Sequence, residues 1–187
     1  WGYTDDDIAN TITVDGFGNI YIAGNSEHPG DNYCDAFLAK YNRTLDLIWN
    51  ITWNEGPNTD NYVNGIDIDA EGNLYLVGEV AGPTLLSNDA FFIKKFNNTG
   101  DMKWDVFLNR TKNDSGNDIV VGDSGNIYVS GYLYNSSING KNAFFAKYNA
   151  DGLQLWNRTY KNGLDGSCNG ITLDIDGNIY LTGNIYQ

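Results

Sequence analysis

Hydrophobic and polar residues alternate over short runs of the chain, and almost the same run occurs four times. The last copy reads "DIDGNIYLTG" at 174–183. Asn19, Asn73, Asn126 and Asn178 occupy the same place in the four copies, at intervals of 54, 53 and 52 residues. A period near fifty residues, with a two-residue alternation inside it, predicts a repeated β unit.

Each period contains four strand-like runs, which we name a, b, c and d. One set reads "DAFLAKYN" at 35–42 for strand a, "LDLIWNITW" at 45–53 for strand b, "NGIDID" at 64–69 for strand c and "NLYLVG" at 73–78 for strand d. The copy of strand a at 89–97, "DAFFIKKFN", has one extra lysine, which is typical of a β-bulge.

The connection between strands c and d is short and ends in Gly-Asn, two residues that tolerate the positive φ of tight hairpin turns. The repeated phrase is therefore the c–d hairpin of a four-stranded unit. We expect the glycine at its end to terminate strand d before a d–a loop. These glycines are Gly24, Gly78, Gly131 and Gly183.

Short polar residues recur at and before the start of strand c. The first set is Asn10, Asn64, Asn117 and Asn169, and four residues earlier stand Asp6, Asp60, Asn113 and Asp165. Such side chains satisfy nearby backbone groups, as Asx turns do. A role repeated in every unit favours a structural function, and a ligand site is the alternative.

These runs predict an all-β fold, a β-propeller of four-stranded blades with about three and a half blades present. The expected full blades are 35–78, 89–131 and 142–183, preceded by a half blade at 1–24. An open sheet edge invites pairing, so we expect either the rest of a longer chain or other copies to complete the ring.

The aromatic residues of strands a and b are expected to pack between neighbouring blades and to be buried. Each ring would contribute on the order of 3 kcal/mol. They are Phe37, Phe91 and Phe144, together with Trp49, Trp104 and Trp156.

Composition narrows the class of partners. The net charge of -13 repels nucleic acid phosphates and anionic lipid head groups, which excludes both as expected partners. No apolar run approaches the ~20 residues that a membrane span needs. The 22 glycines and 3 prolines fit a turn-rich β chain.

The order of motifs resembles the SBBP β-propeller repeat of bacterial and archaeal surface proteins. It is carried by stretches such as "DDIANTITVDGFGNIYIAG" at 6–24 and "DAFLAKYN" at 35–42. The resemblance implies a ring of seven or a similar number of blades, secreted or anchored at the surface, with no common catalytic residues. One copy departs from the pattern, because Gly122 stands where the others have aspartate.

One hairpin contains the pattern D-x-D-x-N, formed by Asp174, Asp176 and Asn178. Alternate oxygens on a tight loop can bind calcium, and a plain hairpin turn is the alternative. No other cofactor is predicted. His28 is the single histidine, and Cys34 and Cys168 fall in non-adjacent blades, so we expect buried thiols and no disulfide between them.

Seven N-x-S/T sequons occur, where the composition gives about three by chance. This excess predicts a glycosylated extracellular protein at the cell surface, of archaeal source given the resemblance. The acceptor asparagines are Asn42, Asn50, Asn97, Asn109, Asn113, Asn135 and Asn157.

Strand alternation should place Asn50 and Asn157 on the face opposite the neighbouring tryptophans. Asn42 and Asn97 fall at the a–b turn, where access should be easiest, and Asn135 falls in a d–a loop.

The function predicted from these features is that of a non-catalytic surface module with a structural or adhesive role. The alternative is a carbohydrate- or protein-binding propeller that uses the ten-residue d–a loops at 25–34, 79–88 and 132–141. An enzyme with a central-channel site is the least favoured, because strand a offers Ala, Phe and Lys rather than paired carboxylates.

Overall fold

The computed structural model describes residues 6–27, 33–82, 90–108, 114–160 and 165–186. Within these ranges all regular elements are strands, which confirms the predicted all-β class. No helix of the described residues is long and apolar enough to cross a membrane.

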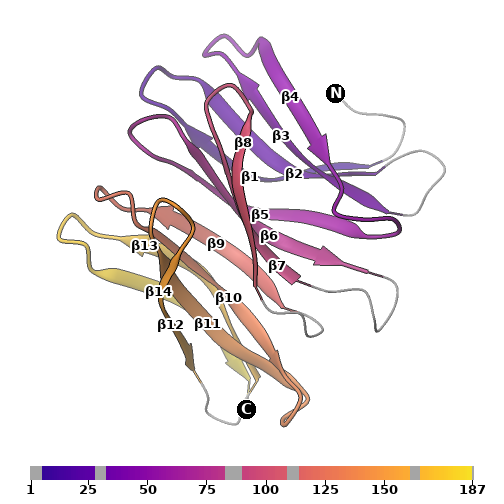
Figure 1. Ribbon diagram of the computed structural model, residues 1–187, viewed down its shortest axis with the longest axis vertical. Helices are drawn as coiled ribbons and strands as arrows, with labels where there is room; N and C mark the ends of the chain where they lie inside the picture. The colour runs from indigo at the N-terminus through magenta and orange to yellow at the C-terminus, as the bar shows by residue number, and fades with distance from the viewer. Residues whose placement is uncertain (1–5, 28–32, 83–89, 109–113, 161–164, 187) are drawn as a thin grey trace.

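In the described part of the chain, fourteen strands form four antiparallel sheets, which follow one another in chain order (Figure 1). The first contains β1 (Asp7–Val14), β2 (Ile20–Glu27), β3 (Cys34–Tyr41) and β4 (Leu47–Trp53). The second contains β5 (Asp60–Ile68), β6 (Leu74–Ala81), β7 (Ala90–Phe96) and β8 (Met102–Leu108). The third contains β9 (Ser115–Val121), β10 (Ile127–Asn135), β11 (Gly140–Tyr148) and β12 (Gln154–Tyr160). The fourth contains β13 (Asp165–Leu173) and β14 (Ile179–Tyr186).

Each full sheet contains strands in the order c, d, a and b. The predicted blade limits 35–78, 89–131 and 142–183 are therefore wrong, and the two-stranded sheet is the last rather than the predicted half blade at 1–24. The reason is that the c–d and d–a connections keep their strands hydrogen-bonded to each other. The b–c connection passes instead from the outer strand of one sheet to the first strand of the next.

The first strands of successive sheets, β1, β5, β9 and β13, pack against one another, and β4, β8 and β12 lie at the outer edges. Strand c is thus the innermost strand. Strand a is the third from the inside, so its residues do not line a central channel, as the expectation about an enzyme site had assumed.

Two hydrophobic cores fill the spaces between the first three sheets. One includes Tyr21, Leu38, Leu76 and Phe92, and the other includes Tyr75, Ile93, Phe91 and Phe144. The predicted burial of the strand-a phenylalanines is confirmed for Phe37, Phe91 and Phe144.

The predicted burial of Trp49, Trp104 and Trp156 is wrong, since all three are only half-buried. They lie on the outer strands of their sheets, β4, β8 and β12. Within its own sheet each ring contacts a strand-d tyrosine, as Trp49 does at a centroid distance of 6.2 Å from Tyr21.

The extra lysine does not produce the predicted bulge, because β7 pairs with β6 without interruption from Ala90 to Phe96. Gly78 lies opposite Phe92, as Gly24 lies opposite Phe37. Counting from these pairs, Lys94 occupies the position that Ala39 and Ala146 hold in the other sheets.

The repeated glycines do not end strand d, contrary to the prediction. Each lies inside its strand, and in each sheet the paired strand c has a β-bulge at this level whose extra residue is the repeated asparagine. In the second sheet Gly78 pairs with Val63, Val77 pairs with Gly65, and Asn64 is the bulged residue. A side chain on Gly78 would meet the bulged strand, with its Cβ only 1.9 Å from the Tyr62 carbonyl oxygen.

The a–b turn of the first sheet contains a strained leucine. Leu45 has φ 67° and a side chain that is 70% exposed, while the equivalent residues Gly100 and Gly152 have φ 88° and 80°. A left-handed conformation costs a residue with a Cβ roughly 1–2 kcal/mol. We expect Leu45→Gly to raise the free energy of unfolding by about 0.5–1 kcal/mol, measured by urea denaturation. Gly100→Ala is the reciprocal control and should lower it, and a loss of stability in Leu45→Gly would contradict this strain.

Candidate functional site

The D-x-D-x-N hairpin of the fourth sheet is held by one carboxylate. The Asp174 Oδ1 accepts the backbone N–H groups of Asp176 at 3.0 Å and Asn178 at 2.8 Å. Its Oδ2 accepts the Asn178 amide at 2.8 Å and the Tyr180 hydroxyl at 3.0 Å. These four bonds favour the hairpin-turn interpretation, and calcium at Asp174, Asp176 and Asn178 stays a prediction. The described residues contain no group of three or more His, Cys, Asp or Glu side chains placed to hold a metal ion.

The same carboxylate staple recurs in the first and second sheets. Asp15 and Asp69 each accept the amide and backbone N–H of the hairpin asparagine and the hydroxyl of a strand-d tyrosine. Partial burial opposes ionisation of Asp69, but the hydrogen bonds outweigh it and hold the pKa below its usual value. In the third sheet Gly122 replaces the aspartate, and the hairpin keeps the backbone bonds from Gly125 N to Gly122 O and from Gly122 N to Asn126 O but has no carboxylate to hold it.

The bulged asparagines tie each sheet to the next. Asn10 Nδ2 donates to Val63 O at 3.0 Å, Asn64 Nδ2 to Gly116 O at 2.9 Å, and Asn117 Nδ2 to Cys168 O at 2.8 Å. Each acceptor immediately precedes the bulged asparagine of the following sheet. These asparagines therefore have the predicted structural role. However, they bind the backbone of the neighbouring sheet and not, as was predicted, that of the adjoining b–c loop.

Asn169, the last of the series, donates to Asn184 Oδ1 at 3.1 Å in its own sheet. Of the aspartates predicted to hold the loop, Asp60 accepts the Cys34 N–H at 3.0 Å and Asp165 accepts the Lys141 N–H. Both bonds join successive sheets at the start of strand a. Asn113 lies outside the described residues.

A second joint lies near the outer edge of the sheets. Trp104 Nε1 and Lys95 Nζ both donate to Ala150 O, at 3.1 and 3.4 Å, in the a–b turn of the next sheet. Trp49 and Lys40 make the same pair of bonds to Asn98 O, at 3.3 and 3.2 Å. Trp49 and Trp104 thus bridge neighbouring sheets as predicted, while the contacts of Trp156 lie within its own sheet.

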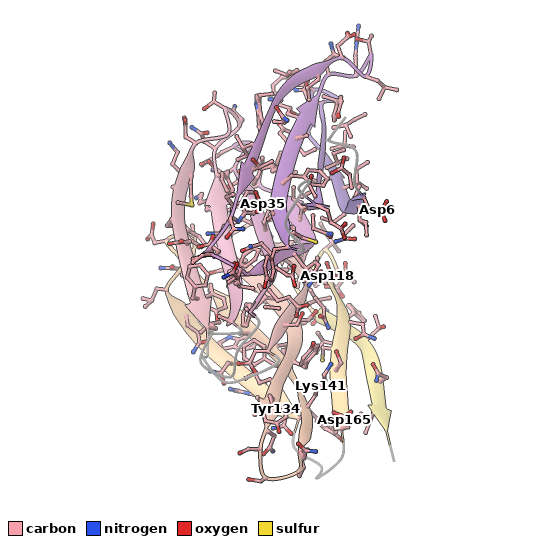
Figure 2. The ribbon with its side chains drawn as sticks, turned by 90° about the vertical axis from the view of Figure 1, so that its right-hand side faces the viewer. Asp6, Asp35, Asp118, Tyr134, Lys141 and Asp165 are labelled. Atoms are coloured by element: carbon pink, nitrogen blue, oxygen red, sulfur yellow. The ribbon has the colours of Figure 1, made fainter. Side chains whose placement is uncertain are left out.

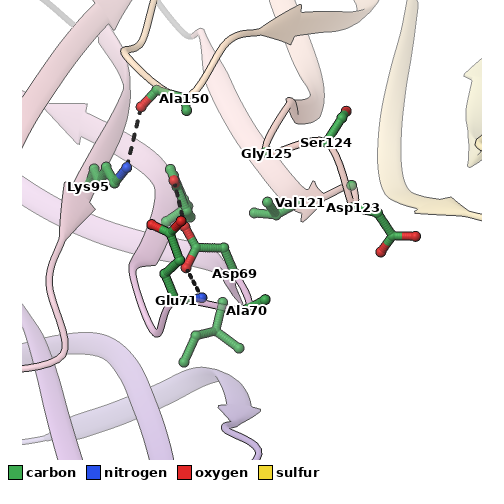
Figure 3. A pocket seen from close by; sticks show the side chains of 12 residues that line it. Asp69, Ala70, Glu71, Lys95, Val121, Asp123, Ser124, Gly125 and Ala150 are labelled. Carbon is green, nitrogen blue, oxygen red and sulfur yellow. Dashed lines mark hydrogen bonds between the residues drawn. The ribbon is translucent and has the colours of Figure 1, made fainter.

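Pockets recur between successive c–d hairpins. Figure 3 shows the one between the second and third sheets, with a volume of about 450 Å³, lined among others by Asp69, Glu71, Lys95, Asp123 and Ser124. Each pair of successive sheets forms such a groove. Pockets of about 550 and 460 Å³ occupy the same place between the first and second sheets and between the third and fourth sheets. Because they recur with each groove, they follow from the shape of the scaffold.

Two inner-strand carboxylates were not singled out from the sequence. Asp67 Oδ2 accepts the Val121 N–H at 2.7 Å, and Asp118 Oδ2 accepts the Ile171 N–H at 2.9 Å. Burial raises the pKa of Asp67, although the hydrogen bonds from the Val121 and Ile68 N–H groups act against it. The alternation of polar and apolar residues in "NGIDID" could have indicated that such an aspartate faces a neighbouring sheet. Both carboxylates join strand c to the next sheet.

The sequons differ in how accessible their acceptor nitrogens are. Asn50 and Asn157 are exposed and alternate with the half-buried Trp49 and Trp156, which confirms their predicted placement. Asn42 and Asn97 lie at the a–b turns but are half-buried, and their Nδ2 atoms donate to Asp46 at 2.9 Å and Asp101 at 3.0 Å. Their access is not the easiest, contrary to the prediction, because each amide is part of its turn.

Of the three remaining acceptor asparagines, Asn135 lies within the described residues. Asn135 ends β10 and is half-buried, because β10 and β11 extend the hairpin and leave only residues 136–139 between them. The predicted ten-residue loop at 132–141 is therefore wrong. Asn109 and Asn113 lie outside the described residues, as does His28.

Both cysteines are free thiols. Cys34 is buried at the start of β3, as expected, and Cys168 in β13 is half-buried. Burial raises the pKa of both thiols and keeps them protonated at neutral pH.

Four-stranded antiparallel sheets that pack side by side through their first strands are the blades of a β-propeller. The family model of SBBP, a β-propeller repeat, matches residues 2–31 and 161–186. These segments include the c–d hairpins of the first and fourth sheets, so the resemblance to this family is confirmed for these two segments. No curated protein matches the chain.

Proposed function

We propose that this chain is a non-catalytic β-propeller module of an extracellular glycoprotein of the cell surface or of a filament, with a structural or adhesive role. The observation that carries the proposal is that the repeated polar residues are engaged in scaffold contacts. Asp15 and Asp69 hold hairpins, while Asn10 and Asn64 link sheets. A fold alone defines no activity, and these contacts favour a supporting role.

The accessible sequons support the extracellular part of the proposal. A sugar is bulky and hydrophilic, so its acceptor nitrogen must reach solvent. Asn50 and Asn157 meet this condition on outer strands. An archaeal surface protein is the source that best combines such sequons with this repeat family.

We include in the proposal that further strands of the same repeat, from the same chain or another copy, pair with β14. In the full sheets the equivalent strands, such as β2, have a strand-a neighbour. Among the described residues, β14 pairs only with β13.

Mass spectrometry of peptides from protein secreted by an N-glycosylating host tests the proposal. We expect glycans at Asn50 and Asn157, and lower occupancy at Asn42 and Asn97, because their amides are bound to carboxylates. Thr52→Ala and Thr159→Ala are matched controls that remove the sequons of Asn50 and Asn157 but keep the asparagines. Bare Asn50 and Asn157 in the secreted protein would contradict the glycoprotein assignment.

A further inference from the structure

In a protein built from repeats, a dedicated site is recognised as a place where one copy departs from the others. The groove between the third and fourth sheets differs in this way from the groove between the first two sheets, near the start of strand c. It contains a pocket of about 430 Å³, lined by residues of β9, β10, β11, β13 and β14. This volume lies within the range of pockets that bind small molecules.

The pocket exists because a small side chain stands where the second sheet has a large aromatic one. Ser167, like Ser115 of the third sheet, stands two residues before its bulged asparagine, where the second sheet has Tyr62. Tyr62 is half-buried, and burial raises its pKa to about 12. It lies against Cys34, whose place Lys141 takes in the third sheet. The groove that Tyr62 occupies between the first two sheets is thus open between the last two.

One wall of the pocket is a chain of oriented amides and a hydroxyl. Asn117 Nδ2 donates to Ser167 Oγ at 2.9 Å, and Ser167 Oγ donates to Asn169 Oδ1 at 2.8 Å. Asn169 Nδ2 then donates to Asn184 Oδ1 at 3.1 Å. These bonds fix the amide planes before any ligand arrives, which lowers the entropy cost of binding.

The other wall combines an aromatic ring with two opposite charges. The Lys141 ammonium lies 3.7 Å from the centroid of the Tyr132 ring. Asp165 accepts the Lys141 backbone N–H, and Figure 2 shows both residues at the same end of the molecule. Within the described part of the chain, the Tyr132 hydroxyl, Lys141 Nζ, Asp165 Oδ2 and Asn184 Nδ2 have no hydrogen-bond partner.

We propose that this pocket binds a neutral monosaccharide unit of a glycan. Sugar hydroxyls donate and accept at once, and the pocket offers free donors on Lys141 and Asn184 with a free acceptor on Asp165. The two charges balance, which favours a neutral ligand over an anionic one. Tyr132 positions the Lys141 donor, because the ammonium lies over its ring. The inference goes beyond the structural role proposed above, which requires no ligand.

Unglycosylated ¹⁵N-labelled protein would be titrated with methyl α-D-glucoside, methyl α-D-mannoside, methyl β-D-galactoside and N-acetylglucosamine. Concentrations up to about 50 mM detect millimolar affinities. We expect at least one sugar to shift the side-chain amide signals of Asn117, Asn169 and Asn184 in a saturable manner. Ser167→Tyr restores the residue type of Tyr62 and should weaken binding by about tenfold or more.

Ser124→Tyr is the matched control, because Ser124 is exposed in the c–d hairpin of the third sheet and its replacement should leave binding unchanged. If Ser167→Tyr does not fold, Asn184→Ala at the half-exposed wall should give the same loss. The proposal is overturned if none of the four sugars shifts these amides, or if the folded pocket variant binds as the unmodified chain does. Neither result bears on the glycans carried by the secreted protein.

Discussion

Replacing Gly78 by alanine is expected to lower the free energy of unfolding by about 4 kcal/mol or more, or to abolish folding. The new Cβ would lie 1.9 Å from the Tyr62 carbonyl oxygen and 2.8 Å from the Phe92 ring. Neither neighbour can yield without moving the bulged strand or a buried ring. Urea denaturation followed by tryptophan fluorescence measures the loss.

Gly16→Ala is the control for this substitution. A Cβ on Gly16 meets nothing within 4 Å, so stability should stay within about 0.5 kcal/mol of the unmodified chain. The equivalent glycines of the other sheets should behave as Gly78 does, since their added Cβ atoms would lie 1.9–2.1 Å from a carbonyl oxygen. A stable Gly78→Ala protein would show that strand c does not bulge toward strand d at this level.

Lys94→Ala is expected to lower the free energy of unfolding by about 3 kcal/mol. Lys94 is only 2% exposed, and its ammonium lies 2.7 Å from Glu55 and 3.2 Å from Asp105. It also lies 5.0 Å from the centroid of the Phe107 ring. Truncation removes the packed methylene groups and leaves two carboxylates without their shared counterion.

A double variant separates packing from charge. Lys94→Met with Glu55→Gln keeps the volume and removes the Lys94–Glu55 ion pair, so it should cost no more than about 1 kcal/mol. Thermal and urea unfolding of both proteins give the comparison. If Lys94→Ala is as stable as the unmodified chain, the ion pairs and the packed side chain of Lys94 contribute nothing. The position would then accept alanine here as it does in the first and third sheets.

The strands and their period could be predicted from the sequence, but the limits of the sheets could not. A chain that repeats a, b, c and d is cyclic, so each of the four strands is an equally good starting point. The choice depends on which connection leaves the sheet. The d–a and b–c connections have similar polar compositions, and only the pairing of β2 with β3 shows that strand d continues into strand a.

The polar residues of the scaffold could be identified, but their partners could not. Asn64 reaches Gly116, which is 52 residues away, so no local spacing indicates the contact. The pocket beside Ser167 was missed because a small residue has no signal of its own. Its detection needed the comparison of Ser167 with Tyr62 at the equivalent place.

The bonds that the bulged asparagines, the inner-strand aspartates Asp67 and Asp118, and the lysine–tryptophan pairs make between neighbouring sheets share one numerical property. Their donors and acceptors are 46 to 58 residues apart, which is close to one period in every case. If one whole repeat of the sequence were duplicated or deleted, each donor would find an equivalent acceptor in the sheet that then lies next to it. Repeat proteins in general have this property, because each repeat contacts only its neighbours. Unequal recombination between copies of the coding sequence can thus change the number of blades while every remaining joint keeps its chemistry.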